Sequence, residues 1–226
     1  MPSFSCSAIL FDLDGVLLDS TRVVAEQYTR WALEHGLDPD EVMKAAHGVR
    51  TIEVVRRVAP QLDAEAETRK IEEREAAADG IVAVPGAVAL LNSIPRGRWG
   101  VVTSGTRFLA TTRMKKFGVP IPDVLVTADD VKHGKPDPEP YRRGAELLGV
   151  DPATCLVVED APAGIRAAHA AGMRVISLPT TYAREQLHEA DVVVSGLSEI
   201  RVSSNGTGGN GVLSISVVDR GAGRTL

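Results

Sequence analysis

Two acidic side chains stand one residue apart near the start of the chain. Asp12 and Asp14 follow the apolar run Ala8-Ile9-Leu10-Phe11, and Gly15 comes next. An apolar run that ends in acidic residues and a glycine is typical of a buried β-strand followed by a loop. Because side chains at positions i and i+2 of an extended chain point the same way, the two carboxylates can converge on one site. Such a pair favours a divalent metal with oxygen ligands or a nucleophile beside an acid/base, and both can hold at once.

Other interpretations of this segment use the same residues. An Asp-x-Asp-Gly sequence is also common as an ordinary solvated turn. A calcium-binding EF-hand loop is excluded, because it needs three alternating ligands before its glycine and Gly15 comes too early. The rest of the chain decides between a turn and a site.

Three further segments place chemically capable residues at or after the ends of predicted strands. The residues are Ser104 and Gly105, then Lys135, then the pair Glu159 and Asp160. The first pair offers a hydroxyl and backbone N–H groups at a predicted helix start, which suits a phosphate. The lysine stands in a proline-framed loop, and each segment alone has an ordinary explanation as a helix cap, a surface lysine or a turn. Carboxylates from two separate strands are a stronger indication of a metal site than either pair alone.

The elements that must position these residues indicate an α/β fold. From about residue 81, short β-rich runs alternate with helical stretches, which is typical of a parallel sheet with helices on both faces. The predicted strands are 99–103, 124–126, 155–159, 174–178 and 192–194. Together with the first strand they predict a doubly wound, Rossmann-like parallel sheet, with the candidate residues at its carboxyl edge.

The segment between the first two predicted strands contains only helical patterns. We expect core at 1–19 and 81–202, with an α-helical cap domain at 20–80 inserted as a lid over Asp12 and Asp14. Within this cap, 63–79 has few large apolar residues and predicts a highly solvated helix. For residues 203–226 we expect a glycine-rich turn and a C-terminal strand or tail, with a hairpin at the sheet edge.

Composition limits the classes of partner. The chain has 226 residues and a net charge of −5, which argues against nonspecific affinity for nucleic acid or an anionic membrane. It contains no eighteen-residue apolar stretch, and its first residues lack the basic region of a secretory signal. We therefore expect a cytoplasmic protein.

The four motifs, taken together, resemble those of the haloacid dehalogenase-like phosphohydrolases. The motifs are Asp12-Leu13-Asp14-Gly15-Val16, Ser104, Lys135-Pro136 and Glu159-Asp160, and the resemblance spans residues 7–200. It is specific to the branch with a helical cap after the first motif, which includes β-phosphoglucomutase and the sugar and polyol phosphate phosphatases. The resemblance implies a Mg²⁺-dependent phosphatase that hydrolyses small sugar or polyol phosphate monoesters through an aspartyl phosphate. Its expected partner is a small phosphorylated metabolite, and the expected state is a monomer or weak homodimer.

The resemblance also implies a role for each motif residue. Asp12 is the nucleophile, and Asp14 protonates the leaving alcohol and then deprotonates the attacking water. Ser104, Gly105 and Lys135 bind the phosphoryl group. The expected Mg²⁺ ligands are Asp12, Asp14 through its backbone carbonyl, and Asp160, with Glu159 as a ligand or just outside the ligand set.

The cap narrows the choice within the family. A related phosphoglucomutase carries a histidine ten residues after the second aspartate, where this chain has Val24, so hydrolysis is favoured over mutase chemistry. The segment His47-Gly48-Val49-Arg50-Thr51 resembles one in glycerol phosphatases and 2-deoxyglucose-6-phosphatases, which implies that His47 and Arg50 contact substrate. The alternative is that His47 caps a helix and Arg50 is solvated. A mutase or phosphotransferase, and a noncatalytic binding protein of this fold, are the other functions weighed.

Overall fold

A parallel sheet forms the centre of the molecule. The computed structural model describes residues 2–46, 48–205 and 212–218. In these residues a six-stranded sheet has the order β6-β5-β2-β7-β8-β9, and every neighbouring pair is parallel. The strands are β2 (Ala8–Phe11), β5 (Trp99–Val102), β6 (Val124–Val126), β7 (Cys155–Glu159), β8 (Arg174–Ser177) and β9 (Val192–Val193). The predicted α/β class is confirmed, and β2 lies in the middle of the sheet.

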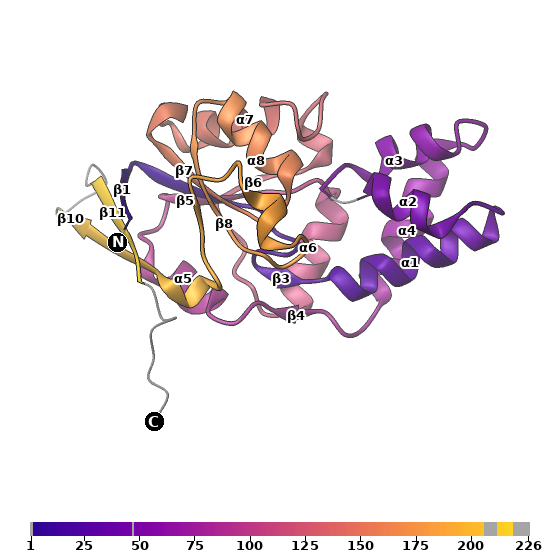
Figure 1. Cartoon of the computed structure of the whole chain (residues 1–226), viewed down its shortest axis with the longest axis horizontal. Coiled ribbons are helices and arrows are strands. Elements are labelled where there is room, and N and C mark those ends of the chain that lie inside the picture. The colour runs from indigo at the N-terminus through magenta and orange to yellow at the C-terminus, as the bar shows by residue number, and fades with distance from the viewer. Residues whose placement is uncertain (1, 47, 206–211, 219–226) are drawn as a thin grey trace.

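Helices cover both faces of this sheet (Figure 1). They are α5 (Ala87–Ser93) and α6 (Arg107–Lys116) on one face, and α7 (Glu139–Leu148) and α8 (Pro162–Ala170) on the other. The alternation along β2 explains the two layers. Ile9 and Phe11 pack into the core beneath α5 and α6, whereas Ala8 and Leu10 pack into the core beneath α7 and α8. Between β8 and β9 the chain forms a 3-10 turn, Arg184–Leu187.

A group of helices lies beyond the carboxyl edge of the sheet, to the right in Figure 1. They are α1 (Thr21–Glu34), α2 (Pro39–Ala46), α3 (Thr51–Val58) and α4 (Ala64–Ala77). They share an apolar core of their own that includes Trp31, Val54 and Ile71, each fully buried. A short antiparallel ribbon of β3 (Leu18–Asp19) and β4 (Val82–Ala83), which we did not predict, flanks this group. The domain boundaries proposed from the sequence stay a prediction.

Helix α4 differs from its prediction. We expected a highly solvated helix, but Glu67, Glu72 and Glu75 are 6%, 3% and 3% exposed. Each finds a hydrogen-bond donor that offsets the loss of water; the indole N–H of Trp31, for example, donates to Glu67 at 2.9 Å. The acidic face of α4 is therefore packed against other helices. Composition alone could not show this, because it does not reveal where the donors lie.

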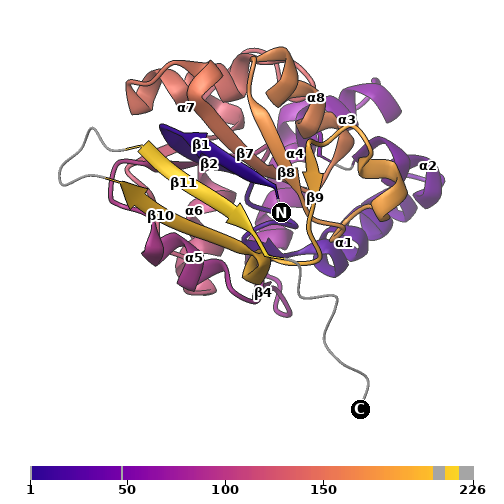
Figure 2. The ribbon, with the colours of Figure 1, turned by 60° about the vertical axis from the view of Figure 1, so that its left-hand side comes forward.

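A second, antiparallel sheet lies at the end of the molecule opposite the helical group (Figure 2). Its strands are β1 (Ser3–Cys6), β10 (Ile200–Asn205) and β11 (Val212–Val217), in the order β1-β11-β10. We expected a hairpin at the edge of the parallel sheet; β10 and β11 do pair, but they join β1 in a separate sheet. The glycine-rich stretch at 206–211 lies outside the described residues.

None of the described helices combines the length and apolar character needed to cross a membrane.

Candidate active site

Three carboxylates gather at the carboxyl ends of two neighbouring strands. Asp12 follows β2 directly, Glu159 ends β7 and Asp160 comes next, so parallel pairing of the two strands brings them together. One carboxylate oxygen from each of these three residues lies within 4.8 Å of the other two. The residues are 8%, 1% and 2% exposed. The structure therefore places the first and fourth sequence motifs in one buried site.

Lys135 lies inside this cluster and is 3% exposed. Its ammonium donates to Asp12 Oδ1 and to Glu159 Oε1, both at 2.7 Å, and to the carbonyl of Val102 at 3.2 Å. The lysine is thus fixed between two motifs rather than extended into solvent.

Glu159 is surrounded by hydrogen-bond donors. Besides Lys135, its Oε1 accepts from the Tyr141 hydroxyl at 3.0 Å. Its Oε2 accepts from the backbone N–H groups of Asp160 and Ala161 at 2.8 and 2.9 Å, where α8 begins. A Cβ on Gly164 would lie 1.6 Å from Oε1, so the carboxylate packs directly against the helix backbone. Glu159 therefore holds the lysine and the start of α8 in place.

The charges of the cluster do not balance. Burial raises the pKa of Asp12 to about 7, against the lowering effect of Lys135. Burial and the Glu159 carboxylate raise the pKa of Asp160 well above its ordinary value. Burial lowers the pKa of Lys135, but Asp12 and Glu159 outweigh it and the net effect is a raised pKa. One ammonium thus faces three carboxylates.

One buried atom indicates what completes the cluster. Asp160 Oδ2 has no hydrogen-bond partner among the described residues. A buried carboxylate oxygen without a partner is costly, and oxygen atoms are the ligands that hard divalent cations prefer. The donor set of Asp12 and Asp160 therefore fits Mg²⁺. A Cβ on Gly15, where φ is +80°, would lie 1.9 Å from Asp160 Oδ2, so only glycine fits at this position.

Asp14 lies beside this cluster in a separate set of contacts. Its Oδ1 accepts from the Ser20 hydroxyl at 2.6 Å and from Arg113 Nη1 at 2.7 Å. Arg113, on α6, is 1% exposed, and its Nη2 also donates to Glu75 of α4 at 2.9 Å. Burial raises the pKa of Glu75 to about 7. Neither Arg113 nor Glu75 could be predicted as a site residue, because a charged residue on a largely polar helix gives no signal of burial in the sequence.

A cavity of about 100 Å³ joins these groups. Residues on the sheet side of the cavity include Asp12, Asp14, Ser104, Gly105, Arg113 and Asp160. Residues from the helical group include Val24, Tyr28, Val49, Thr51 and Glu75. The carboxylates of Asp12, Asp14 and Asp160 thus face a cavity whose lining is partly apolar. Val24, the position at which a mutase would carry histidine, is part of this wall.

Ser104 and Gly105 lie on the same wall. The Ser104 hydroxyl donates to the carbonyl of Gly48 at 3.0 Å, across the boundary between the sheet and the helices above it. The next residue, Thr106, caps α6, and its hydroxyl and backbone N–H bind Glu72 of α4. The helical group is therefore held against the phosphate-binding candidates by direct hydrogen bonds.

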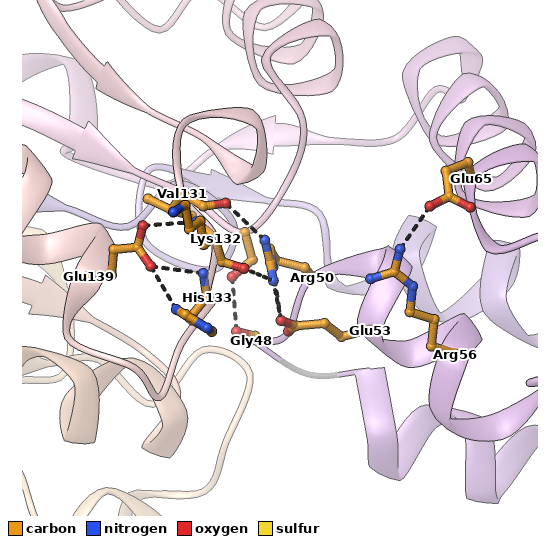
Figure 3. Close-up of polar contacts among 10 residues, drawn as sticks. Gly48, Arg50, Glu53, Arg56, Glu65, Val131, Lys132, His133 and Glu139 are labelled. Carbon is orange, nitrogen blue, oxygen red and sulfur yellow. Dashed lines mark hydrogen bonds and ion pairs between the residues drawn. The ribbon is translucent and has the colours of Figure 1, made fainter.

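Arg50 lies in another contact between the helical group and the sheet (Figure 3). Its guanidinium donates to the carbonyls of Val131 at 3.2 Å and Lys132 at 2.8 Å, in the loop that leads to Lys135. It also pairs with Glu53, one turn along α3. A Cβ on Gly134 would lie 2.8 Å from Arg50 Nε, so the loop packs closely on this side chain. Direct contact between Arg50 and substrate stays a prediction, and His47 lies outside the described residues.

Comparison with known proteins gives matches over most of the chain. The family model for haloacid dehalogenase-like hydrolases matches residues 6–172. Hexitol phosphatase A of Escherichia coli is 42% identical over 209 residues, which cover 90% of this chain and 97% of that protein. The 2-deoxyglucose-6-phosphate phosphatase 1 of Saccharomyces cerevisiae is 36% identical, with coverage of 92% and 95%. CbbY of Rhodobacter sphaeroides, solved in complex with phosphate, superposes with a TM-score of 0.76 at 25% identity, covering 86% of this chain and 96% of that one.

Proposed function

The chain belongs to the haloacid dehalogenase-like hydrolases, and we propose that it is a Mg²⁺-dependent phosphatase of small sugar or polyol phosphate monoesters. The observation that carries this proposal is the buried cluster of Asp12, Lys135, Glu159 and Asp160, in which Asp12 and Asp160 line the cavity. Relatives that match along nearly their whole length are a hexitol phosphatase and a 2-deoxyglucose-6-phosphate phosphatase, which supports the substrate class.

Asp12 is the nucleophile in this proposal. Its Oδ1 is held by Lys135, which leaves the second carboxylate oxygen to attack phosphorus. A bond forms between that oxygen and phosphorus while the ester P–O bond breaks, and the alcohol leaves with the bridging oxygen. The product of this first step is an aspartyl phosphate on Asp12.

Asp14 acts first as the general acid and then as the general base. Ser20 and Arg113 both bind its Oδ1, so Oδ2 is the atom left to carry the proton. Asp14 gives this proton to the leaving alkoxide oxygen, which makes the neutral alcohol. It then takes a proton from the water that attacks phosphorus, and phosphate leaves Asp12 with its carboxylate restored.

The remaining motif residues stabilise charge. The Ser104 hydroxyl, the Gly105 N–H and the Lys135 ammonium bind phosphoryl oxygens. Asp12, Asp160 and the backbone carbonyl of Asp14 hold Mg²⁺, which when bound offsets the charge of the carboxylates and of the phosphate. Glu159 already accepts from four donors, so we place it outside the ligand set, where it holds Lys135.

The same aspartyl phosphate could serve a sugar-phosphate mutase. That function requires the phosphoryl group to survive until a sugar hydroxyl replaces the water. Val24 lines the cavity where the related mutase carries histidine, which favours transfer to water.

Phosphate release tests the proposal. The substrates are a hexitol 6-phosphate, 2-deoxyglucose 6-phosphate, glycerol 1-phosphate and β-glucose 1-phosphate, each with Mg²⁺ or with EDTA. We expect metal-dependent release from the polyol and sugar esters. Release from none of them, or conversion of β-glucose 1-phosphate into the 6-phosphate, would overturn the proposal.

A further inference from the structure

Two buried charged groups in the cavity make no contact with the phosphoryl group in the proposed steps, although one of them binds Asp14. Glu75 comes from α4 and Arg113 from α6, and they are 3% and 1% exposed. Their ion pair joins Oε2 to Nη2 at 2.9 Å. The other carboxylate oxygen, Glu75 Oε1, and the guanidinium atom Arg113 Nε have no hydrogen-bond partner among the described residues. Both side chains line the cavity.

Unpartnered atoms of this kind require a reason. A buried donor or acceptor left unpaired costs free energy, and most such groups in folded proteins find a partner. Here one acceptor and one donor remain on the same ion pair, in the wall of the space where substrate is expected. A ligand with hydroxyl groups would satisfy both, because a hydroxyl donates and accepts.

The position of the pair indicates which part of the substrate it meets. Arg113 binds Asp14, the residue that protonates the leaving oxygen in the proposed mechanism. The groups next to Asp14 are therefore on the side of the alcohol, not of the phosphoryl group. Val24 and Leu109, which line the same cavity, offer apolar contact for the carbon chain.

We propose that Glu75 and Arg113 bind hydroxyl groups of the leaving alcohol and select neutral polyhydroxy phosphates. Glu75 Oε1 accepts from one hydroxyl, and Arg113 Nε donates to another. Glu75 already neutralises the single positive charge of Arg113, so a second anionic group on the alcohol would find no free cation beside it. This inference rests on the proposed phosphatase function and adds that the protein recognises the hydroxyl groups of the leaving alcohol.

The test compares three substrates at pH 8, where Glu75 is ionised. The first is a hexitol 6-phosphate. The second, p-nitrophenyl phosphate, has no hydroxyl groups, and the third, phosphoglycolate, has an anionic alcohol. The variant is Glu75→Gln. Because Arg113 needs an acceptor, the substituted amide turns its NH₂ toward the cavity and replaces the acceptor by a donor. Glu73→Gln, an exposed site on the same helix, is the matched control.

We expect Glu75→Gln to lower kcat/KM for the hexitol ester by about 10-fold to 100-fold, mainly through KM, and to lower that for p-nitrophenyl phosphate by less than about threefold. We expect phosphoglycolate to be a poor substrate of the wild type and to improve relative to the hexitol ester in Glu75→Gln. Glu75→Asp, which keeps the charge, should recover part of the hexitol preference and guards against a folding defect.

Two results would overturn this inference: a ratio of hexitol to p-nitrophenyl activity that Glu75→Gln leaves unchanged, or a wild type that prefers phosphoglycolate. Failure of the underlying function would look different, since the wild type would then release no phosphate from any ester with Mg²⁺, and the inference would fall with it.

Discussion

Removing divalent metal should make the stability of this protein depend on pH through Asp12. The pKa of this carboxyl is about 7 in the metal-free folded protein, against an ordinary value of 3.8. The folded state therefore holds the proton more tightly than the unfolded chain. The stabilisation from this proton is fully present below about pH 3.8 and is lost as pH rises toward 7.

The size of the effect follows from that difference. Each unit of pKa shift corresponds to about 1.4 kcal/mol, so Asp12 alone accounts for at most about 4 kcal/mol between pH 4 and pH 7.5. Asp160, whose pKa is also raised, acts in the same direction. A cation that binds the ionised carboxylates reverses this preference, because it stabilises the charged form. Mg²⁺ should therefore stabilise the protein more at pH 7.5 than at pH 4.5.

Urea unfolding at several pH values, with metal-stripped protein and with saturating Mg²⁺, measures this difference. The comparison at each pH is essential, because Glu75 also has a pKa of about 7 and destabilises the protein over the same pH range, whether or not metal is present. Its effect cancels in the difference between the two curves. A Mg²⁺ stabilisation that is constant from pH 4.5 to 7.5 would refute the argument, and Asp160→Asn should abolish the stabilisation.

Three substitutions test other parts of the site. Ser104→Ala should lower kcat/KM about 10-fold to 100-fold in steady-state assays, since it removes a phosphoryl donor; an unchanged value would remove Ser104 from the site. Gly15→Ala places a Cβ against Asp160 Oδ2, so Mg²⁺ titration of activity should show an affinity for the metal that is weaker by at least about tenfold (about 1.4 kcal/mol). An unchanged titration would contradict this packing. Arg50→Ala frees the loop before Lys135 and should lower kcat/KM about tenfold, whereas Arg56→Ala, an exposed control whose partner is Glu65 (Figure 3), should match the wild type; equal effects of the two would contradict the contact.

The parallel sheet and its catalytic edge were predictable because the signal is local. The apolar run of β2 and the residues after it carry both the strand and its acidic loop, and the same holds for β7 and Glu159. Once the strands are parallel, their carboxyl ends must lie together, so the cluster of Asp12 and Asp160 follows from topology.

The leaving-group side of the cavity was not predictable in this way. Arg113 and Glu75 lie 38 positions apart in the chain, on two different helices, and the helix that carries Glu75 was expected to be highly solvated. Their burial results from mutual pairing, which depends on how the helical group docks onto α6. Asp14 could be predicted as a site residue, but its hydrogen bond with Arg113 could not. Sequence patterns therefore predicted the residues that gather at the carboxyl edge of the sheet, but not the buried ion pair between α4 and α6.

In the proposed mechanism, Asp12 carries the phosphoryl group between the two steps. The most direct measurement is a rapid acid quench of the enzyme turning over a hexitol 6-phosphate with Mg²⁺, followed by peptide mass spectrometry. We expect a hydroxylamine-sensitive phosphoryl group on the peptide that contains Asp12, and its loss, together with phosphate release, in Asp12→Asn. A phosphoryl group on another residue, or Mg²⁺-dependent turnover that persists in Asp12→Asn, would contradict the account.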